Sequence, residues 1–296
     1  IKFVRGAGKM AFSSVRDMVE LCKETGQPLY EVILESDLTE SGLTRAESEA
    51  EMHRLWSVMC ATSAGYCSTD RSMSGFAGGD AAKVSEAAAR GILYADGYFA
   101  DVMAEALKTA ECNACMKRIV AAPTAGASGV LPAVLLPLQA RDGLDDRRMV
   151  EALYVAAGFG QVIATRASIS GAEGGCQAEV GSASGMAAAA LVYVMGGTPG
   201  QMAHACAMAL SNTLGLVCDP VAGLVEVPCV NRNVMGAVNA LSCAEMALSG
   251  VESAIPCDEV IDAMRAVGDA LPASLRETGS GGLAATPTGR RLAERL

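Results

Sequence analysis

Alternation of apolar and polar residues, the pattern of a half-buried strand, is almost absent from this chain, whereas helical segments follow one another along nearly its whole length. We expect helices over ten segments, bounded by capping or helix-breaking residues: 13–25, 29–40, 44–62, 81–107, 131–141, 147–165, 184–195, 199–214, 234–249 and 257–271. Gly91 and Gly97 are possible breaks within the segment 81–107. Thr44 with Glu47 three residues later predicts a capping box, and Pro199 after Thr198 suits the first position of a helix. The sequence therefore predicts an all-α fold.

The chain is long enough for one large core. It has 296 residues, and neither an internal repeat nor a low-complexity linker divides it, so we expect residues 1–296 to form a single helical domain. Hydrophobic residues make up 51%, largely alanine, whereas aromatic residues make up only 4%. Side chains this small allow helices to approach one another closely.

The charge and the apolar runs exclude several classes of protein. A formal net charge of −10 argues against a nucleic-acid partner. The most apolar run, the 13 residues 185–197, is too short to cross a bilayer, and no signal peptide is recognisable, so we expect a cytoplasmic protein without a membrane partner. The sequence begins with Ile1 rather than methionine, which is consistent with a missing leading segment.

Glycine-rich turns separate the predicted helices. The most prominent lie at 72–80, 122–129, 168–185 and 276–289, with two further turns around residues 218 and 229. Glycine lets backbone N–H groups approach an anion, and helix N-termini add partial positive charge. Turns that converged in one place would form a pocket for a small anionic ligand. The alternative is that they are only the tight corners of a helical bundle.

Three of these turns carry a cysteine each: Cys176, Cys218 and Cys229. A thiol at a helix end or on a loop is better placed to bind a metal than one inside a packed helix. Three thiolates are one short of the usual four for an iron–sulfur cubane, and an iron left open can act as a Lewis acid on a substrate oxygen. The total of eleven cysteines is odd, which favours a reducing compartment over a disulfide framework.

Another pair of cysteines, Cys112 and Cys115, has the C-x-x-C spacing of redox and metal sites. No second pair completes a zinc site. We therefore favour the interpretation that these two are chance neighbours on a helix.

The glycine-rich motifs together resemble the alpha chain of bacterial iron–sulfur-dependent L-serine dehydratase. The resemblance rests on SISGAEGGCQAEVGSASGMAAA, TLGLVCDPVAGLVEVPCVNRN, RETGSGGLA, SMSG with GGDAAK, and APTAGASGVLPAV, and it extends over about residues 6–289. The cysteine spacing is its most specific part. Forty-one residues separate Cys176 from Cys218, and ten separate Cys218 from Cys229.

The resemblance implies an all-helical catalytic domain whose glycine-rich turns converge on a [4Fe–4S] cluster held by Cys176, Cys218 and Cys229. It also implies deamination of L-serine to pyruvate and ammonia. In this family a beta part supplies a Ser-His-Thr stretch, which is absent from this sequence. We therefore expect a separate beta subunit, an oligomeric assembly and a complete site only in the complex.

Carboxylates near the cysteines are candidates for orienting ligands or receiving protons. Of Glu173, Glu179 and Asp219, we choose Glu173 and Asp219 as catalytic candidates, although Asp219 before a proline could equally form a turn. His53 and His204 lie outside the family motifs, so the principal base is expected on the partner.

Substrate binding is expected from the turn 122–129, the turn 72–80 and one arginine. The candidates are Thr124, Gly126, Ser128, Gly129, Ser72, Ser74 and Arg232. Arg232 could pair with a substrate carboxylate in a bidentate manner, and its alternative role is a structural ion pair.

Three rival functions remain at this stage. One is non-enzymatic: the chain could be an iron–sulfur or structural subunit whose catalytic partner carries out the chemistry. A lyase of the same fold and cluster could act on L-cysteine and expel sulfide, and no residue decides between serine, cysteine and threonine. A pyridoxal-phosphate dehydratase is disfavoured, because only Lys83 lies close to a glycine-rich turn and the strands of an α/β fold are missing.

Overall fold

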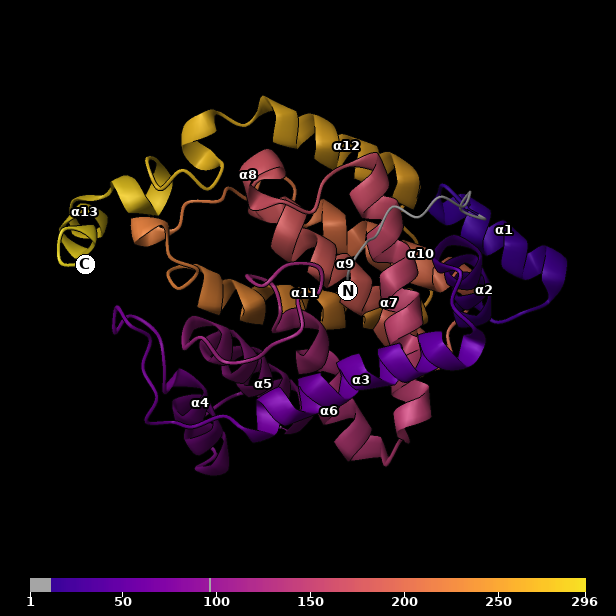
Figure 1. Cartoon of the computed structure of the whole chain (residues 1–296), viewed down its shortest axis with the longest axis horizontal. Helices are drawn as coiled ribbons and strands as arrows, with labels where there is room; N and C mark the ends of the chain where they lie inside the picture. The colour runs from indigo at the N-terminus through magenta and orange to yellow at the C-terminus, as the bar shows by residue number, and fades with distance from the viewer. Residues whose placement is uncertain (1–11, 96) are drawn as a thin grey trace.

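The computed structural model describes residues 12–95 and 97–296 and confirms the all-α prediction, since this part of the chain forms helices and no β-strand (Figure 1). The α-helices are α1 (Val15–Thr25), α2 (Leu29–Ser41), α3 (Arg45–Ala64), α4 (Asp80–Ala89), α5 (Gly97–Ala114), α6 (Val130–Asp142), α7 (Asp146–Arg166), α8 (Gly171–Gly174), α9 (Ser182–Val194), α10 (Pro199–Ser211), α11 (Cys229–Leu248), α12 (Cys257–Ala270) and α13 (Pro287–Ala293). They pack into a single compact domain.

Local sequence signals set most helix ends. The predicted capping box of α3 is present, with Thr44 and Glu47 exchanging hydrogen bonds, and Thr198 caps α10 in the same way ahead of Pro199. The predicted helix 81–107 is in fact two helices, α4 and α5, because the chain turns at Gly91 in a left-handed conformation.

The glycine-rich segment 168–185 is more helical than expected. It contains the short helix α8 and a π-helix, Gln177–Gly181, that runs directly into α9. A π-helix inserts an extra residue into a helical turn and is often found at functional sites. The prediction of a turn was therefore wrong over α8 and from Gln177 to residue 183, while the helix predicted from residue 184 is confirmed.

Helix α9 is the centre of the core. Every residue from Ser182 to Tyr193 is buried, and α7, α10, α11 and α6 pack around it. The close packing depends on small side chains, since a Cβ added at Gly185 would lie 3.0 Å from the Cys206 Sγ atom on α10. The alanine-rich sequence therefore belongs to a helix that other helices surround. No helix of the described residues is both long and apolar enough to cross a bilayer.

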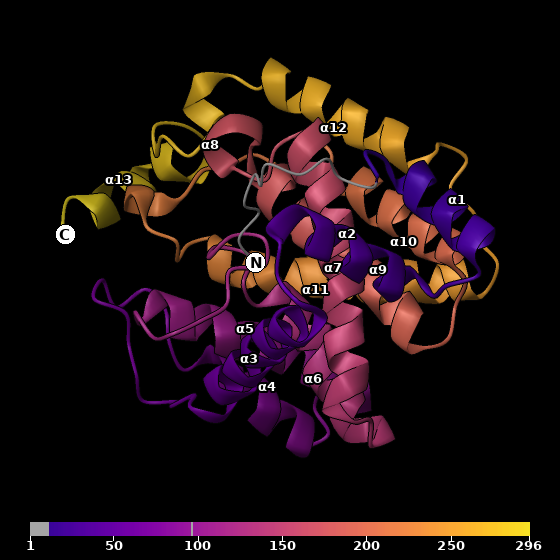
Figure 2. The same ribbon diagram turned by 45° about the vertical axis from the view of Figure 1, so that its right-hand side comes forward.

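The remaining helices form an outer shell (Figures 1 and 2). Helices α1 and α2 lie at one end and α12 lies along one side, while α4, α5 and α6 occupy the opposite side. Helix α3 packs against α7, and α13 lies near the C-terminus at the far edge.

The fold brings the N-terminal ends of three helical segments together. Helix α11 packs against both α6 and the π-helix, and the turn 122–129 leads directly into α6. Cys229 is the first residue of α11, and Cys176 immediately precedes the π-helix. Partial positive charge at such helix ends favours thiolates and other anions.

Candidate active site

Cys176 lies between α8 and the π-helix and is buried. Burial raises the pKa of its thiol to about 11, while the nearby Arg232 guanidinium acts in the opposite direction. The thiol therefore sits beside a positive charge inside the protein.

Cys218 is fixed by the C-terminal part of the chain. Its backbone N–H donates to Leu275 O at 2.9 Å, and its carbonyl accepts from Glu277 N at 2.8 Å, so Cys218 and Arg276 form an isolated parallel bridge. Burial raises the pKa of its thiol, and the Glu179 carboxylate and the Cys176 thiol raise it further. The segment 275–277 is thus part of the site although it lies far along the sequence.

Cys229 begins α11 directly after Pro228 and is partly buried. Burial raises the pKa of its thiol to about 12, and Cys176 and Glu179 add to this effect. Cys218 likewise responds to both Cys176 and Cys229. The structure therefore brings the three predicted thiols together as electrostatic neighbours.

The three thiols are the candidate donor set for the expected cluster. No group of three or more His, Cys, Asp or Glu side chains in residues 12–95 and 97–296 lies in an arrangement that could hold a metal ion as it stands. A cubane is wider than one ion, and it needs thiols that surround a common space and can lose their protons to the metal. Cys176, Cys218 and Cys229 come from separate segments and act electrostatically on one another, with the Arg232 guanidinium close to Cys176, which is consistent with part of that requirement.

Arg232 and Asp219 form a buried ion pair. Arg232 Nη2 lies 2.9 Å from Asp219 Oδ1, and Arg232 Nη1 donates to Val217 O at 2.7 Å. The second Asp219 oxygen accepts from Leu283 N at 2.7 Å. This network holds the residues on both sides of Cys218 against α11 and the C-terminal segment, so the structural ion pair considered for Arg232 is present. Its role toward substrate, and the catalytic role of Asp219, stay predictions.

The turn 122–129 is tied to α11 by Asn233, which is buried. Asn233 Oδ1 accepts from Gly129 N at 2.9 Å, and Nδ2 donates to Gly126 O at 2.8 Å and to Cys229 O at 2.9 Å. The Gly129 N–H therefore already donates a hydrogen bond within the protein. The Ser128 hydroxyl is buried and has no hydrogen-bond partner among the described residues.

Glu179 projects from the π-helix into the space between the thiols and this turn. Its Oε2 atom lies 4.0 Å from Cys218 Sγ, and a Cβ added at Gly126 would lie 3.6 Å from its Oε1 atom. The Thr124 hydroxyl faces the carboxylate without a hydrogen bond of standard geometry. Burial raises the pKa of Glu179. Of the three carboxylates that flank the cysteines in sequence, this one lies closest to the predicted substrate turn.

Ser72 and Ser74 join the site through a further carboxylate. Both hydroxyls donate to Glu226 Oε2, Ser72 at 2.7 Å, and Glu226 is buried three residues before Cys229. The turn 72–80 is thus linked to the start of α11.

Other candidates lie elsewhere. Glu173 is exposed on α8, and its carboxylate accepts from Ser168 Oγ at 2.6 Å. His53 is exposed on α3, 3.6 Å from an Asp146 oxygen. His204 lines a different cavity of about 250 Å³, between α1, α10 and the start of α12, and its Nδ1 accepts from Ser253 N.

Two residues that organise the site escaped the sequence analysis, Asn233 and Glu226. Asn233 lies four residues after Cys229, about one turn along α11, and Glu226 lies three residues before it, in the turn ahead of the helix. Helical spacing from a candidate ligand was the available signal for Asn233 alone.

The fold and the candidate site together define a helical protein in which cysteines from three glycine- and proline-containing turns are electrostatic neighbours. The family model described as "Serine dehydratase alpha chain" matches residues 24–284. The chain belongs to this family of serine dehydratase alpha chains.

Individual relatives agree over most of the chain. It is 48% identical to a probable L-serine dehydratase alpha chain of Bacillus subtilis, covering 96% of this chain and 95% of that protein. It is 42% identical to an L-serine dehydratase alpha chain of Peptoniphilus asaccharolyticus, covering 95% and 96%. A 38% identical match, L-serine dehydratase 2 of Escherichia coli, is a longer protein, of which this chain spans 61%.

Proposed function

We propose that this chain is the alpha subunit of an L-serine dehydratase, which converts L-serine to pyruvate and ammonia and completes its active site with a separate beta subunit. Family membership supports the reaction, and the relatives named alpha chains support the partner. The observation that carries the proposal is the meeting of Cys176, Cys218 and Cys229 beside the turn 122–129.

We further propose that these three thiols hold a [4Fe–4S] cluster. When bound, such a cluster would supply a Lewis-acidic iron for the departing hydroxyl of serine. All eleven cysteines are free thiols, which is consistent with a protein that works in the reducing cytoplasm.

The chain's own residues would bind and orient the amino acid. The Ser128 and Thr124 hydroxyls are buried without a hydrogen bond of standard geometry and would bind the substrate carboxylate. Glu179, between these residues and Cys218, is suited to hold the substrate ammonium group or to receive a proton. Asn233, Glu226 and the Asp219–Arg232 pair would keep the turns and thiols in place.

The test is anaerobic purification of this chain together with its partner subunit, followed by pyruvate assay with L-serine and analysis of bound iron and sulfide. Cys218→Ala should abolish turnover and reduce the iron content. Cys60→Ala, which changes a partly buried cysteine of α3, should change neither. Undiminished activity of Cys218→Ala would refute the proposal.

The same preparation can be used to compare L-serine with L-cysteine as substrates. Pyruvate formation from L-serine should exceed that from L-cysteine by at least about tenfold in kcat/KM, the discrimination that one well-placed polar contact supplies. Preference for L-cysteine, with release of sulfide, would identify the desulfidase alternative.

A further inference from the structure

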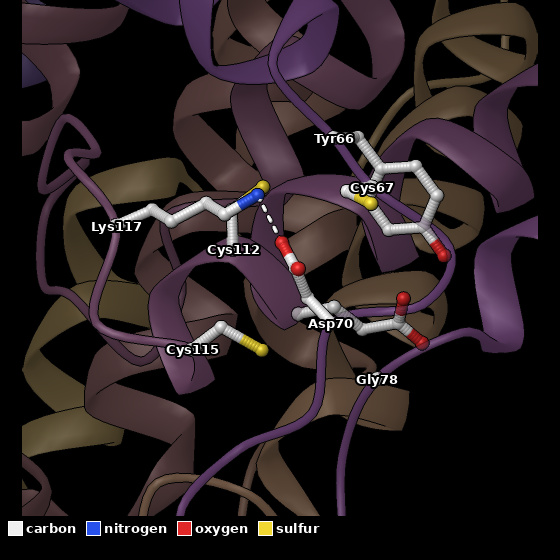
Figure 3. Close-up of a pocket in the computed structure, with 8 residues that line it drawn as sticks. Tyr66, Cys67, Asp70, Gly78, Cys112, Cys115 and Lys117 are labelled. Atoms are coloured by element: carbon white, nitrogen blue, oxygen red, sulfur yellow. Dashed lines mark ion pairs between the residues drawn. The ribbon is translucent and has the colours of Figure 1, made fainter.

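A second group of cysteines lies outside the proposed active site. Cys67, Cys112 and Cys115 line one small pocket together with Asp70 and Lys117 (Figure 3). The pocket is too tight to admit even a water molecule, so it is not a ligand site. Its lining contains three thiols, the Asp70–Lys117 ion pair and the Glu111 side chain.

Cys67 is the accessible member of the group. It is exposed in the loop after α3, and its Sγ atom lies 3.1 Å from Thr69 Oγ1. The hydrogen bond with Thr69 lowers the pKa of this thiol below its usual value. Accessibility and thiolate character are what make a cysteine sensitive to peroxides.

The C-x-x-C pair supplies less accessible thiols. Cys112 is buried in the last turn of α5, with its Sγ donating to Thr62 O at 3.7 Å, and Cys115, which is partly buried, follows the helix. Burial raises the pKa of both thiols, that of Cys112 to about 11. Such thiols are poor first targets for an oxidant but can react with a neighbouring sulfenic acid.

A positive charge connects the loop to this pair. The Lys117 ammonium forms an ion pair with Asp70, donates to Gly65 O at 3.0 Å, and interacts electrostatically with both Cys67 and Cys112. A neighbouring ammonium stabilises thiolate over thiol. The arrangement has the parts of a peroxide-sensitive site: an exposed thiol, a resolving thiol and a cation.

We propose that Cys67, Cys112 and Cys115 form a reversible thiol redox site, in which a hydroperoxide oxidises Cys67 and one thiol of the C-x-x-C pair resolves it as a disulfide. In the first step the Cys67 sulfur takes an oxygen atom from the hydroperoxide, giving a sulfenic acid and water or an alcohol. In the second step the resolving sulfur attacks the Cys67 sulfur, a disulfide forms and water leaves. A dithiol such as thioredoxin's or dithiothreitol would restore the three thiols.

The site is connected to the catalytic turns, which gives its oxidation a consequence. Cys67 and Asp70 belong to the same loop as Ser72 and Ser74, which bond to Glu226 ahead of Cys229. Glu226 also acts electrostatically on Cys115. A disulfide would displace the Asp70–Lys117 ion pair and pull on this loop. The redox site itself, however, does not depend on the proposed dehydratase reaction.

The test uses the complex of this chain with its partner subunit, treated with a limiting amount of hydrogen peroxide, trapped with dimedone or an alkylating reagent and digested for mass spectrometry. Cys67 should react at least about tenfold faster than Cys60, a partly buried cysteine of α3 outside the pocket. Untrapped protein should contain a disulfide between Cys67 and either Cys112 or Cys115, and dithiothreitol should remove it.

Variants separate this outcome from general oxidation. Cys67→Ser should abolish the disulfide, and Cys112→Ser/Cys115→Ser should leave a dimedone-reactive sulfenic acid at Cys67, whereas Cys60→Ser should behave as the parent. Circular dichroism would verify that the variants are folded. A Cys67 thiol that alkylates fully after peroxide treatment, or a disulfide that joins only Cys112 to Cys115, would overturn the proposal.

Discussion

Asn233 shows how much one buried side chain can organise. It makes three hydrogen bonds that join the turn 122–129 to the first turn of α11, where Cys229 lies. A buried side-chain amide without hydrogen-bond partners destabilises a protein, so an asparagine at this position needs partners for both its oxygen and its N–H groups. The residue therefore couples the predicted substrate turn to a predicted cluster ligand.

Replacing Asn233 should destabilise the protein. Asn233→Ala would remove three hydrogen bonds and leave the Gly129 N–H and two carbonyls without this partner, at a cost of about 2–4 kcal/mol in the free energy of unfolding. Urea denaturation monitored by circular dichroism measures it. The matched control is Asn231→Ala, an exposed asparagine of the same helix, which should stay within about 0.5 kcal/mol of the parent. Equal effects of the two variants would contradict the assigned role.

Glu179 and Glu173 flank Cys176 on either side in sequence but differ in place. Glu179 lies in the thiol centre and Glu173 on the surface. We expect Glu179→Gln to lower kcat/KM for L-serine by at least about 100-fold in the anaerobic complex, with iron content retained, because a group that binds the substrate or carries its proton contributes on this scale. Glu173→Gln should lower it by less than about threefold. A fully active Glu179→Gln variant would return the carboxylate role to Glu173 or Asp219.

At the scale of elements, the sequence predicted the helices better than their junctions. Capping residues such as Thr44 and Thr198 act through their own neighbours, so their helices begin where the sequence indicates. The π-helix Gln177–Gly181 could not be predicted in this way. Its extra residue is stabilised by tertiary contacts, including Gln177, whose side chain bonds to Met264 O on α12 and to Gly215 N.

The candidate site could likewise be predicted only in part from the sequence. The cysteine spacing and the glycine-rich turns predicted which thiols and turns form the candidate site. Residue type and the resemblance to a known family were enough for that prediction. The partners that hold them, Asn233 and Glu226, depend on which helix faces which turn. That information arises only when segments distant in sequence pack together.

The C-terminal segment depends on a glycine that no other residue can replace. Gly282 has φ +55°, and a Cβ there would lie 2.3 Å from Asp219 Oδ2, the oxygen that accepts from Leu283 N. Gly282→Ala should destabilise this segment by roughly 2–3 kcal/mol, seen as faster amide exchange over residues 276–286. Gly279 also has a left-handed φ, +63°, but its nearest contact is 3.5 Å away, so Gly279→Ala should cost only about 1 kcal/mol. Equal exchange in both variants would exclude the clash with Asp219.

At the scale of the whole molecule, the apolar core extends well beyond the thiol centre. Helix α9 and the helices around it bury a continuous apolar cluster. Cys176 and Cys218 belong to this cluster, whereas Cys229 is partly buried, and most of the cluster lies in helices that carry none of the three thiols. The scaffold should therefore persist when the site is emptied, unlike a zinc finger, whose fold depends on its ion.

Iron removal tests whether the scaffold persists. Exposure of the complex to air followed by a chelator should abolish serine deamination and remove the proposed cluster's visible absorption, because a cubane with an open iron is readily lost. The far-ultraviolet circular dichroism should stay unchanged, and anaerobic reconstitution with iron and sulfide should restore activity. Loss of the helical signal together with iron would show that the metal supports the fold.

The pairing of Cys218 with residues 275–277 has a consequence for biogenesis. During translation Cys218 leaves the ribosome before its hydrogen-bond partners exist, since Leu275 and Glu277 are synthesised more than fifty residues later. The nascent polypeptide would thus be unable to retain iron until its last helices emerge. On the proposed function, maturation factors would meet a nearly finished polypeptide, and a chain cut short ahead of Leu275 would accumulate as a helical but metal-free product.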